Sequence, residues 1–308
     1  MDVIRLNKEH LEYIDNLSAA IGQFDGLHIA HLELINTAIN ISKEKNLKSA
    51  IITFDPHPDF ILKKVVDETY ITPIEEKIKL IKSFKIDYLI IINFDIEVAG
   101  TNPLDFVKNY LLNIGVKEVV CGFDFSFGKF GKGKANDITD FSGGLINTTI
   151  IDEIKFNNQK IGSSLIKELL GCGDVLKVKQ IMGRFYSVTA KVVKGSQIGK
   201  KVGVPTANLE INSEFADVKA GVYSVLVHYN NEKYLGVCNI GHNPSFNYQS
   251  NKRVEVHILN FDKNIYEDYL KVDFLEYLRE ESRFESVTDF QNQIKKDIEN
   301  ALKYKNLL

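Results

Sequence analysis

Residues 19–31 read AAIGQFDGLHIAH, and this stretch decides the fold of the first half of the chain. The apolar run Ala19–Phe24 is typical of a short buried strand, and Asp25-Gly26 predicts a tight turn after it. From about His28 to Asn46, apolar residues recur on one side of a helical pattern. The sequence therefore predicts a strand, a turn and a helix in immediate succession.

The same alternation of strand-like and helix-like patterns continues through the first half. Further strands are expected at 49–54, 87–92 and 117–121, with helical patterns at 73–84 and 104–113. Strands that alternate with helices predict an α/β fold with a doubly wound parallel sheet. Ligands of such sheets bind beyond the carboxyl ends of the strands, where the strand order reverses, and the polar motifs of this half follow strand ends.

The pattern changes after about Met182. Short β segments are expected at 186–193, 223–229, 233–237 and 254–259, separated by turns rich in Gly, Asn and charged residues. A helical tail follows at 287–303, with apolar residues at a spacing of four. This half predicts a β-barrel closed or braced by a C-terminal helix, and it divides the chain into domains 1–182 and 183–308.

Composition limits the classes of function. At 308 residues the chain has room for two domains, and its net charge of -3 gives no basic field that would favour nucleic acid. Its three cysteines lie far apart, without the spacing of a metal site or of a disulfide framework. The amino terminus carries charges where a signal peptide needs an apolar core, and the apolar runs are too short to cross a membrane. We expect a cytoplasmic protein with small-molecule ligands and no nucleic-acid or membrane partner.

Two histidines stand at the start of the first helix. His28 and His31 are three residues apart, so both imidazoles should point the same way, beside the free N–H groups of the helix end. That combination suits a nucleotide triphosphate. The alternative is a pair of capping or core histidines. A zinc-protease site is excluded, because the glutamate and the spacing of HExxH are missing.

A second candidate site is GSQIGKKVGVPTANL at 195–209. Its glycines recur at every fourth residue: Gly195, Gly199 and Gly203. Such a backbone can bend sharply and bring N–H groups close to a phosphate. Thr206 and Asn208 then place two oxygen-bearing side chains on one face of a strand, as a hard cation beside a phosphate requires. An ordinary glycine-rich turn before a strand is the alternative.

The second half resembles riboflavin kinases. The resemblance rests on the glycine-rich loop before PTAN and on four later pieces in family order: Gly221-Val222-Tyr223, NIGHNPSF (239–246), VEVHIL (254–259) and LREESRFES (278–286). Ser245 stands where the family usually has Thr, which keeps a hydroxyl. The resemblance implies a six-stranded type of β-barrel that phosphorylates riboflavin to FMN with Mg²⁺ and ATP.

The same resemblance assigns roles to residues of that barrel. Glu255 would be the general base, Thr206 and Asn208 would hold Mg²⁺, the loop 195–203 would cradle the phosphates, and Arg279 would contact the flavin. The residue pattern alone leaves Glu255 open as a plain carboxylate on a strand face.

The first half resembles FAD synthetases of the adenylyltransferase superfamily. The pieces that carry this resemblance are GQFDGLHIAH (22–31), TFDPHP (53–58), CGFDFSFGKFGKG (121–133) and IGSSLIKELLGCGDV (161–175). Three departures from the family pattern are Ala30 for glycine, Gly162 with Ser164 for Ser and Thr, and Lys167 for Arg. A lysine keeps the charge but loses the two-pronged donor geometry. The resemblance implies a nucleotidyltransferase-like sheet that transfers AMP from ATP to FMN, giving FAD and pyrophosphate.

The resemblance also implies the residues of this site. His28, His31 and Lys167 would stabilise the reacting phosphates. ATP would further contact Gly22, Phe24, Asp25, Gly26, Ser163 and Ser164. The flavin would contact Asp124, Phe125 and Phe127, although alternating phenylalanines are equally typical of strand core.

The sequence allows three other interpretations to be compared with this one. Gly128–Lys134 fits the opening of a P-loop, but Ala135 stands where that motif needs Ser or Thr, so we reject it. A riboflavin kinase with a weakened upstream domain is an alternative suggested by Ala30, Leu165 and Lys167. A non-catalytic flavin sensor is a more distant one, because it has little need for Glu255 together with the two oxygen donors of PTAN.

Overall fold

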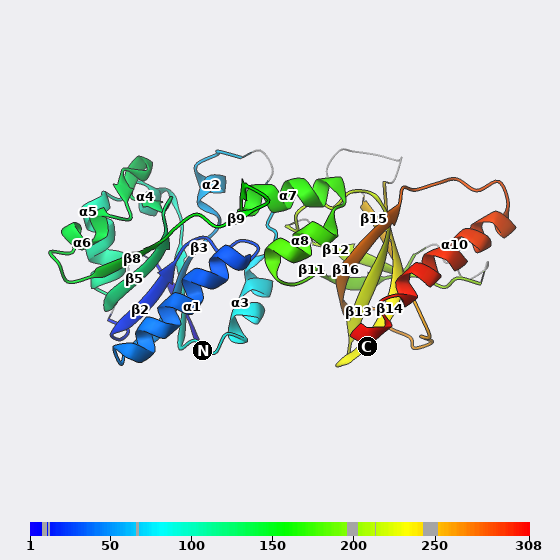
Figure 1. The fold of residues 1–308 in the computed structure, drawn as a ribbon, viewed down its shortest axis with the longest axis horizontal. Coiled ribbons are helices and arrows are strands. Elements are labelled where there is room, and N and C mark those ends of the chain that lie inside the picture. Colours follow the sequence, from blue (N-terminus) through cyan, green and yellow to red (C-terminus); the bar gives the residue numbers. More distant parts are fainter. Residues whose placement is uncertain (8–10, 12, 66–67, 196–202, 213, 243–251) are drawn as a thin grey trace. The chain divides into compact units, whose positions relative to one another are not determined.

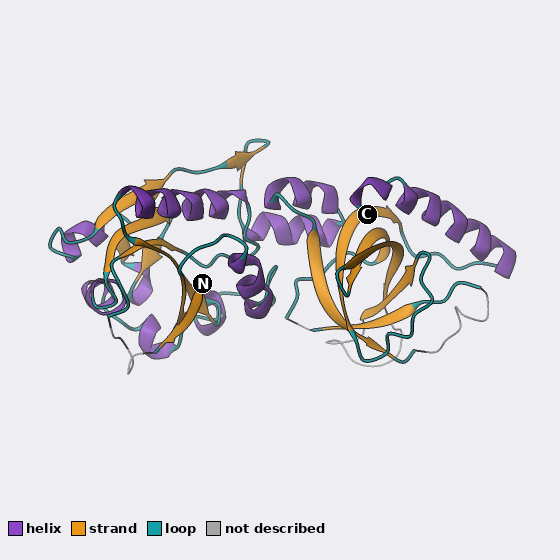
Figure 2. Cartoon of the chain, turned by 90° about the horizontal axis from the view of Figure 1, so that it is seen from below, coloured by secondary structure: helices purple, strands orange, loops and turns teal. Residues whose placement is uncertain are grey.

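The chain folds into two compact units, Met1–Ser163 and Ser164–Leu308. The computed structural model describes all residues except 8–10, 12, 66–67, 196–202, 213 and 243–251 (Figure 1). The first unit is built on a sheet between helices, and the second on a barrel with a long C-terminal helix (Figure 2).

The sheet of the first unit has six strands in the order β1-β4-β3-β2-β5-β8. The strands are β1 (Asp2–Leu6), β2 (Leu17–Ile21), β3 (Lys48–Asp55), β4 (Tyr88–Asn93), β5 (Val116–Gly122) and β8 (Asn147–Ile151). All neighbours pair in parallel, which confirms the expected doubly wound sheet. From β2 the chain first builds toward β4 and then crosses to β5, so the strand order reverses between β2 and β5.

Helices and short hairpins connect these strands. The helices are α1 (Ile29–Glu44), α2 (Pro58–Ile61), α3 (Ile74–Lys82), α4 (Ile96–Ala99), α5 (Pro103–Phe106), the π-helical η1 (Val107–Leu112), the short η2 (Lys129–Gly131) and α6 (Asp137–Phe141). The minor strands are β6 (Ser126–Phe127), β7 (Gly133–Lys134), β9 (Lys155–Phe156) and β10 (Gln159–Lys160).

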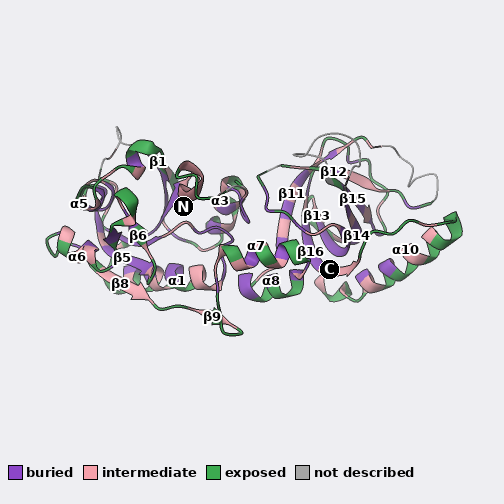
Figure 3. Cartoon of the chain, turned by 90° about the horizontal axis from the view of Figure 1, so that it is seen from above, coloured by how far each residue is buried: buried purple, intermediate pink, exposed green. Residues whose placement is uncertain are grey.

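Both faces of the sheet are buried (Figure 3). On one face, Ala20 lies in a cluster with Leu34 and Ile35 of α1. On the other, Ala19 and Ile21 lie in a second cluster that includes the side chains of α5 and η1. A strand covered on both sides needs an unbroken apolar sequence, and all five residues of β2 are buried.

The second unit is a closed antiparallel barrel in the order β11-β12-β15-β14-β13-β16. Its strands are β11 (Tyr186–Val193), β12 (Ala207–Ile211), β13 (Gly221–Tyr229), β14 (Glu232–His242), β15 (Lys252–Ile258) and β16 (Tyr269–Arg279). The burial of β11 alternates at every residue, as expected of a strand with one face in the barrel interior. The six-stranded barrel is confirmed.

Helices cover the outside of the barrel. They are α7 (Ser163–Cys172), α8 (Val175–Met182), α10 (Val287–Leu302) and the short η3 (Lys305–Leu307). The C-terminal α10 packs on β13 and β14, and α8 packs on β11 and β16. The second compact unit begins at Ser164, before the expected domain boundary between residues 182 and 183. The expected boundary concerns which residues each activity needs, and it stays a prediction.

Candidate active sites

Three motifs of the first unit meet at the carboxyl edge of its sheet. The turn 22–28 follows β2, the segment 56–58 follows β3, and the loop 123–134 follows β5. Because β2 adjoins both β3 and β5, the three segments leave neighbouring strands at the point where the strand order reverses. This edge is the first candidate site.

The turn 22–28 has an unusual backbone. Phe24, Gly26 and Leu27 have φ angles of 52°, 81° and 42°, in the left-handed region. Glycine adopts this region freely, but in other residues the side chain makes this backbone conformation less stable. The side chains of Phe24 and Leu27 are 0% and 1% exposed in the core, and this packing holds the turn.

Hydrogen bonds fix the centre of the turn. The Asp25 carboxylate, 2% exposed, accepts from the backbone N–H groups of Ile71 (3.2 Å) and Thr72 (2.9 Å). The Ser163 hydroxyl donates to the Asp25 carbonyl at 3.2 Å. Asp25 and Ser163 thus shape the turn, and direct contact of either with ATP stays a prediction, as it does for Gly22, Phe24 and Gly26.

The structure brings His28 and His31 together. His28 caps the N-terminus of α1, and its Nδ1 accepts from the His31 N–H at 3.3 Å. The two rings stack with their centroids 3.6 Å apart and an angle of 13° between their planes. Both rings lie at the N-terminus of α1, where the positive end of the helix dipole favours an anion. The pair therefore combines a capping role with the properties of an anion site.

Phe127, which was expected to contact the flavin, lies in the core of the first unit, and its contact with flavin stays a prediction. The ring is 5% exposed and packs against Phe106, with their centroids 5.4 Å apart. Phe127 is a core residue, because the chain leaves β5 at Gly122 and turns the ring inward as the β6–β7 hairpin begins. Phe125, half-buried, stacks on it with a centroid distance of 5.8 Å.

The remaining predicted residues of this half are Asp124, Ser164 and Lys167. Asp124 is exposed and forms an ion pair with Lys160, whose ammonium also lies 4.9 Å from the centre of the Phe123 ring. Ser164 and Lys167 belong to α7, within the second compact unit. Their contacts with nucleotide stay predictions.

The second candidate site is a row of polar side chains across three strands of the barrel. Glu255 on β15 is paired in register with Asn208 on β12 and with Asn239 on β14. Residues opposite each other in antiparallel strands share a face of the sheet. Val254 and Val256 are buried, so Glu255 between them lies on the outer face of the barrel. The row is therefore accessible to a ligand.

A cavity of about 580 Å³ opens at this row. One wall comes from the barrel and is mainly polar, with Thr206, Asn239, Arg253, Glu255 and His257. The other comes from the segment before α10 and from α10 itself. Its apolar side chains are Phe284, Val287, Phe290 and Ile294, and its polar ones are Glu281, Ser282, Glu285 and Ser286. A pocket lined by both apolar and polar side chains suits a small amphipathic ligand such as an aromatic ring carrying hydroxyls.

The polar wall is internally braced. Arg253 forms an ion pair with Glu255, and the His257 imidazole is 2.7 Å from the Pro205 carbonyl, which fixes the PTAN segment against β15. A β-carbon at Gly195 would collide with the Asn208 amide, which would then have to move from its present position. Gly203 has a φ of 80°. Gly199 lies outside the described residues.

Arg279 lines the same cavity but is held by the protein. Its Nη2 is 2.8 Å from the Asp297 carboxylate of α10, its Nε donates to the same carboxylate at 3.2 Å, and its Nη1 donates to Ser282 at 3.1 Å. Asp297 is 1% exposed. Arg279 thus ties α10 to β16, and its contact with flavin stays a prediction.

Several cavity residues were not singled out from the sequence. Asn239 lies inside NIGHNPSF, but only the strand register shows that it faces Glu255. Phe284 and Phe290 form an edge-to-face pair with centroids 5.4 Å apart, and their spacing before and within the C-terminal helix could have indicated an apolar wall. Within the described part of the chain, no group of three or more His, Cys, Asp or Glu could hold a metal, and no helix is long and apolar enough to span a membrane.

Fold and sites together define a two-part enzyme of nucleotide chemistry, a parallel nucleotidyltransferase-type sheet followed by a kinase-type barrel. The family model for FAD synthetase matches residues 11–165, and the model for riboflavin kinase matches residues 182–305. Bifunctional riboflavin kinase/FMN adenylyltransferases of Bacillus subtilis and Listeria monocytogenes are each 34% identical over 92% of this chain and cover 91% and 90% of their own lengths.

A solved structure agrees with the whole fold. It is titled a macrolide-efflux protein from Streptococcus pneumoniae, is 27% identical, and superposes with a TM-score of 0.89 over 96% of this chain and 97% of its own.

The chain belongs to the family of bifunctional riboflavin kinase/FMN adenylyltransferases. It phosphorylates riboflavin to FMN and adenylylates FMN to FAD.

Proposed function

We propose that the turn 22–28, the stacked histidines and Lys167 carry out the adenylylation of FMN. An FMN phosphate oxygen attacks the α-phosphorus of ATP, the bond to the β-phosphate oxygen breaks, and pyrophosphate leaves. The FMN phosphate is already an anionic nucleophile, so no base is needed. His28, His31 and Lys167 would instead stabilise the charge on the pentavalent phosphorus and on the leaving group. The histidine stack at the N-terminus of α1 supports this assignment.

We propose that the row on the barrel phosphorylates riboflavin. Glu255 accepts the proton of the 5′-hydroxyl, the hydroxyl oxygen attacks the γ-phosphorus of ATP, and ADP leaves. The single observation that carries this assignment is the position of Glu255 in the cavity, in register with Asn208 and Asn239. The flavin ring would lie against the apolar side chains of this cavity, Phe284 and Phe290 among them.

Magnesium fits this site by the chemistry of its donors. Thr206 and Asn208 offer two side-chain oxygens two residues apart, at the start of β12 and beside Glu255. Oxygen ligands that leave room for waters and phosphates are what Mg²⁺ prefers, and the ion would neutralise phosphate charge during transfer. Gly195 and Gly203, with the loop between them, would cradle the phosphates.

Replacing Glu255 by Gln tests the kinase assignment. The amide keeps the shape but cannot accept the proton, and a positioned base contributes roughly 10²–10⁴-fold. FMN formation from riboflavin should fall by that factor, while FAD formation from supplied FMN stays near normal. The matched control is Glu210→Gln, an exposed carboxylate on the adjacent strand β12. Equal loss of both activities would mean general misfolding, and no loss would place the base elsewhere.

A further inference from the structure

A lysine occupies the apolar face of α3. Ile74, Ile78 and Ile81 recur at helical spacing on that face, and Lys77 stands among them with 1% of its surface exposed. Lysine is almost never fully buried unless its charge is paired. The position calls for an explanation beyond packing.

The ammonium of Lys77 reaches the turn of the first site. Its Nζ donates to the Gln23 carbonyl at 2.8 Å, and the Thr53 hydroxyl, 0% exposed, donates to the same oxygen at 2.9 Å. The charged groups that face Lys77 are the carboxylates of Asp25, in the turn, and of Asp55, at the end of β3. Asp55 is itself paired with Arg5 at 3.1 Å.

Burial of this lysine costs stability. Removal from water lowers its pKa from 10.5 to about 8, although Asp25 and Asp55 act in the opposite direction. An apolar side chain at this position would avoid that cost. A residue that weakens the fold is expected where function depends on it.

The hydrogen bond from Lys77 to the Gln23 carbonyl joins α3 to the turn 22–28, next to the residues with left-handed φ angles. Gln23 precedes Phe24, the first residue with a left-handed φ. The Asp25 carboxylate is bound by the segment that leads into α3, so α3 and its lead-in hold two successive points of the turn. Three residues beyond Asp25, His28 begins the catalytic pair.

We propose that Lys77 is a positioning residue for FMN adenylylation, which acts through the Gln23 carbonyl on the turn that presents His28 and His31. This inference rests on the proposed role of the two histidines. Misplacement of catalytic groups by about 1 Å can cost on the order of 10²-fold in rate. Because the histidines act on the transition state, the loss should appear in kcat more than in KM.

The test uses full-length Lys77→Met, with Lys79→Met on the exposed side of α3 as the matched control. We expect the kcat for FAD formation from FMN to fall about 10- to 100-fold. The KM for ATP should stay within about threefold. FMN formation from riboflavin and all kinetics of Lys79→Met should match the unmodified chain. A kcat for FAD formation within twofold of normal in Lys77→Met would overturn the proposal.

Two further variants separate positioning from folding. Thr53→Val removes the other donor to the Gln23 carbonyl, so its effect should be non-additive with that of Lys77→Met. Lys77→Arg keeps charge and donors and should recover part of the lost kcat. Additive losses would overturn the proposal, as would a chain in which both Lys77 variants fail to fold, since Lys77 would then be a folding residue. His28→Ala, made in parallel, tests the underlying assignment: if it leaves FAD formation intact, the histidine role fails independently of Lys77.

Discussion

At the scale of single residues, Lys167 is one of the positions where this chain departs from the FAD synthetase pattern. The family has Arg at this position, whose planar fork can bind two phosphate oxygens, whereas lysine offers a point charge. We expect Lys167→Arg to leave the rate of FAD formation unchanged or to raise it up to several-fold. Pyrophosphate release with FMN and ATP measures this, with Lys179→Arg on α8 as a control. A clear drop in rate would show that the site is built around lysine.

Lys77 also predicts a pH dependence of stability. Its pKa in the folded chain is about 8, below the ordinary 10.5, so between these values the unfolded chain holds a proton that the folded chain has released. The contribution of this group to stability therefore rises as pH increases from about 8 to about 10.5, by on the order of 3 kcal/mol. Below pH 8 the full cost of burial is present.

Denaturant unfolding at pH 7 to 10 checks this prediction. The free energy of unfolding of the unmodified chain, minus that of Lys77→Met, should increase across the range. The subtraction removes the titration of groups common to both chains. A difference that stays flat would show that the lysine keeps an ordinary pKa.

At the scale of elements, the tie between α10 and β16 controls one wall of the kinase cavity. Asp297 is buried and receives three hydrogen bonds from Arg279 and one from Gln293. Asp297→Asn leaves the guanidinium without its counter-charge, and breaking such a pair costs about 3 kcal/mol or more. We expect a lower melting temperature and a raised KM for riboflavin, because Phe290 and Ile294 are carried by α10. FAD formation from FMN should be unaffected.

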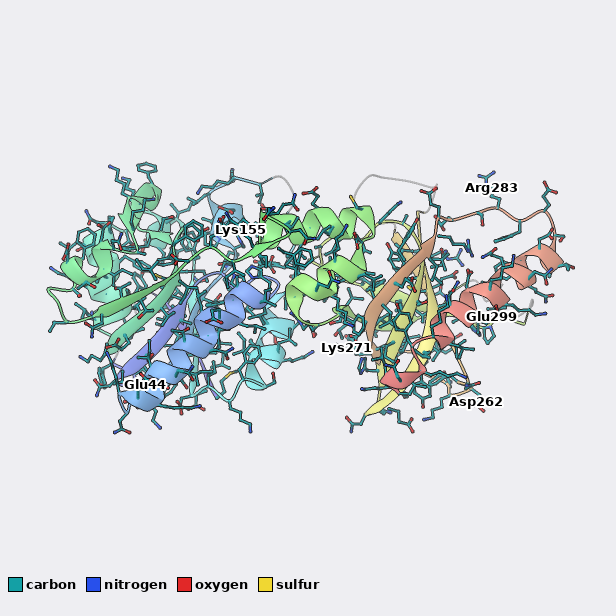
Figure 4. The ribbon with its side chains drawn as sticks, viewed as in Figure 1. Glu44, Lys155, Asp262, Lys271, Arg283 and Glu299 are labelled. Carbon is teal, nitrogen blue, oxygen red and sulfur yellow. The ribbon has the colours of Figure 1, made fainter. Side chains whose placement is uncertain are left out.

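The control for this variant is Glu299→Gln. Glu299 is exposed on the same helix (Figure 4) and should change neither stability nor kinetics. If Asp297→Asn lowers the melting temperature but leaves the KM for riboflavin unchanged, the helix wall does not contribute to flavin binding.

The sequence predicted most elements of the sheet, because each central strand is an unbroken apolar run followed by a turn. It did not predict β1 or β8, which lie at the two edges of the sheet and are less apolar. In the second half it did not predict β16, whose pairing with β13 shifts register twice, so its apolar residues do not alternate cleanly. A strand that is buried in a regular way has a regular pattern of apolar residues in its sequence. Edge strands and strands with bulges lack such a pattern.

The residues of the candidate sites were also predictable only in part. Side chains within one motif, such as the two histidines, were predictable from local spacing. Groups joined only by tertiary contacts were not: the pairing of Asn239 with Glu255 depends on strand register, and the bond of Lys77 to Gln23 joins residues 54 positions apart. Phe127 shows what such a pattern leaves open: alternating phenylalanines are compatible both with a ligand slot and with a core, and only the structure shows that this ring is buried.

At the scale of the whole molecule, the two activities should be separable. The cavity residues of the barrel all follow residue 203, so fragments 164–308 and 183–308 should both form FMN and no FAD. The shorter fragment lacks α8, which buries Val175, Val178, Ile181 and Met182. Each buried aliphatic side chain contributes roughly 1.5–3 kcal/mol, so 183–308 should melt at a clearly lower temperature. Product chromatography and calorimetry measure the two effects. A well-folded 164–308 fragment without kinase activity would contradict the modular interpretation.

Alternation along β15 has a consequence for how such an enzyme can change over generations. Val254, Val256 and Ile258 face the packed interior, while Arg253, Glu255 and His257 face the cavity. Adjacent positions of one short strand therefore meet different requirements, one set filling the interior and the other facing what is bound. Replacements at Arg253 or His257 can therefore alter what the cavity holds while Val254, Val256 and Ile258 keep the barrel closed, whereas Glu255 is tied to the proposed chemistry.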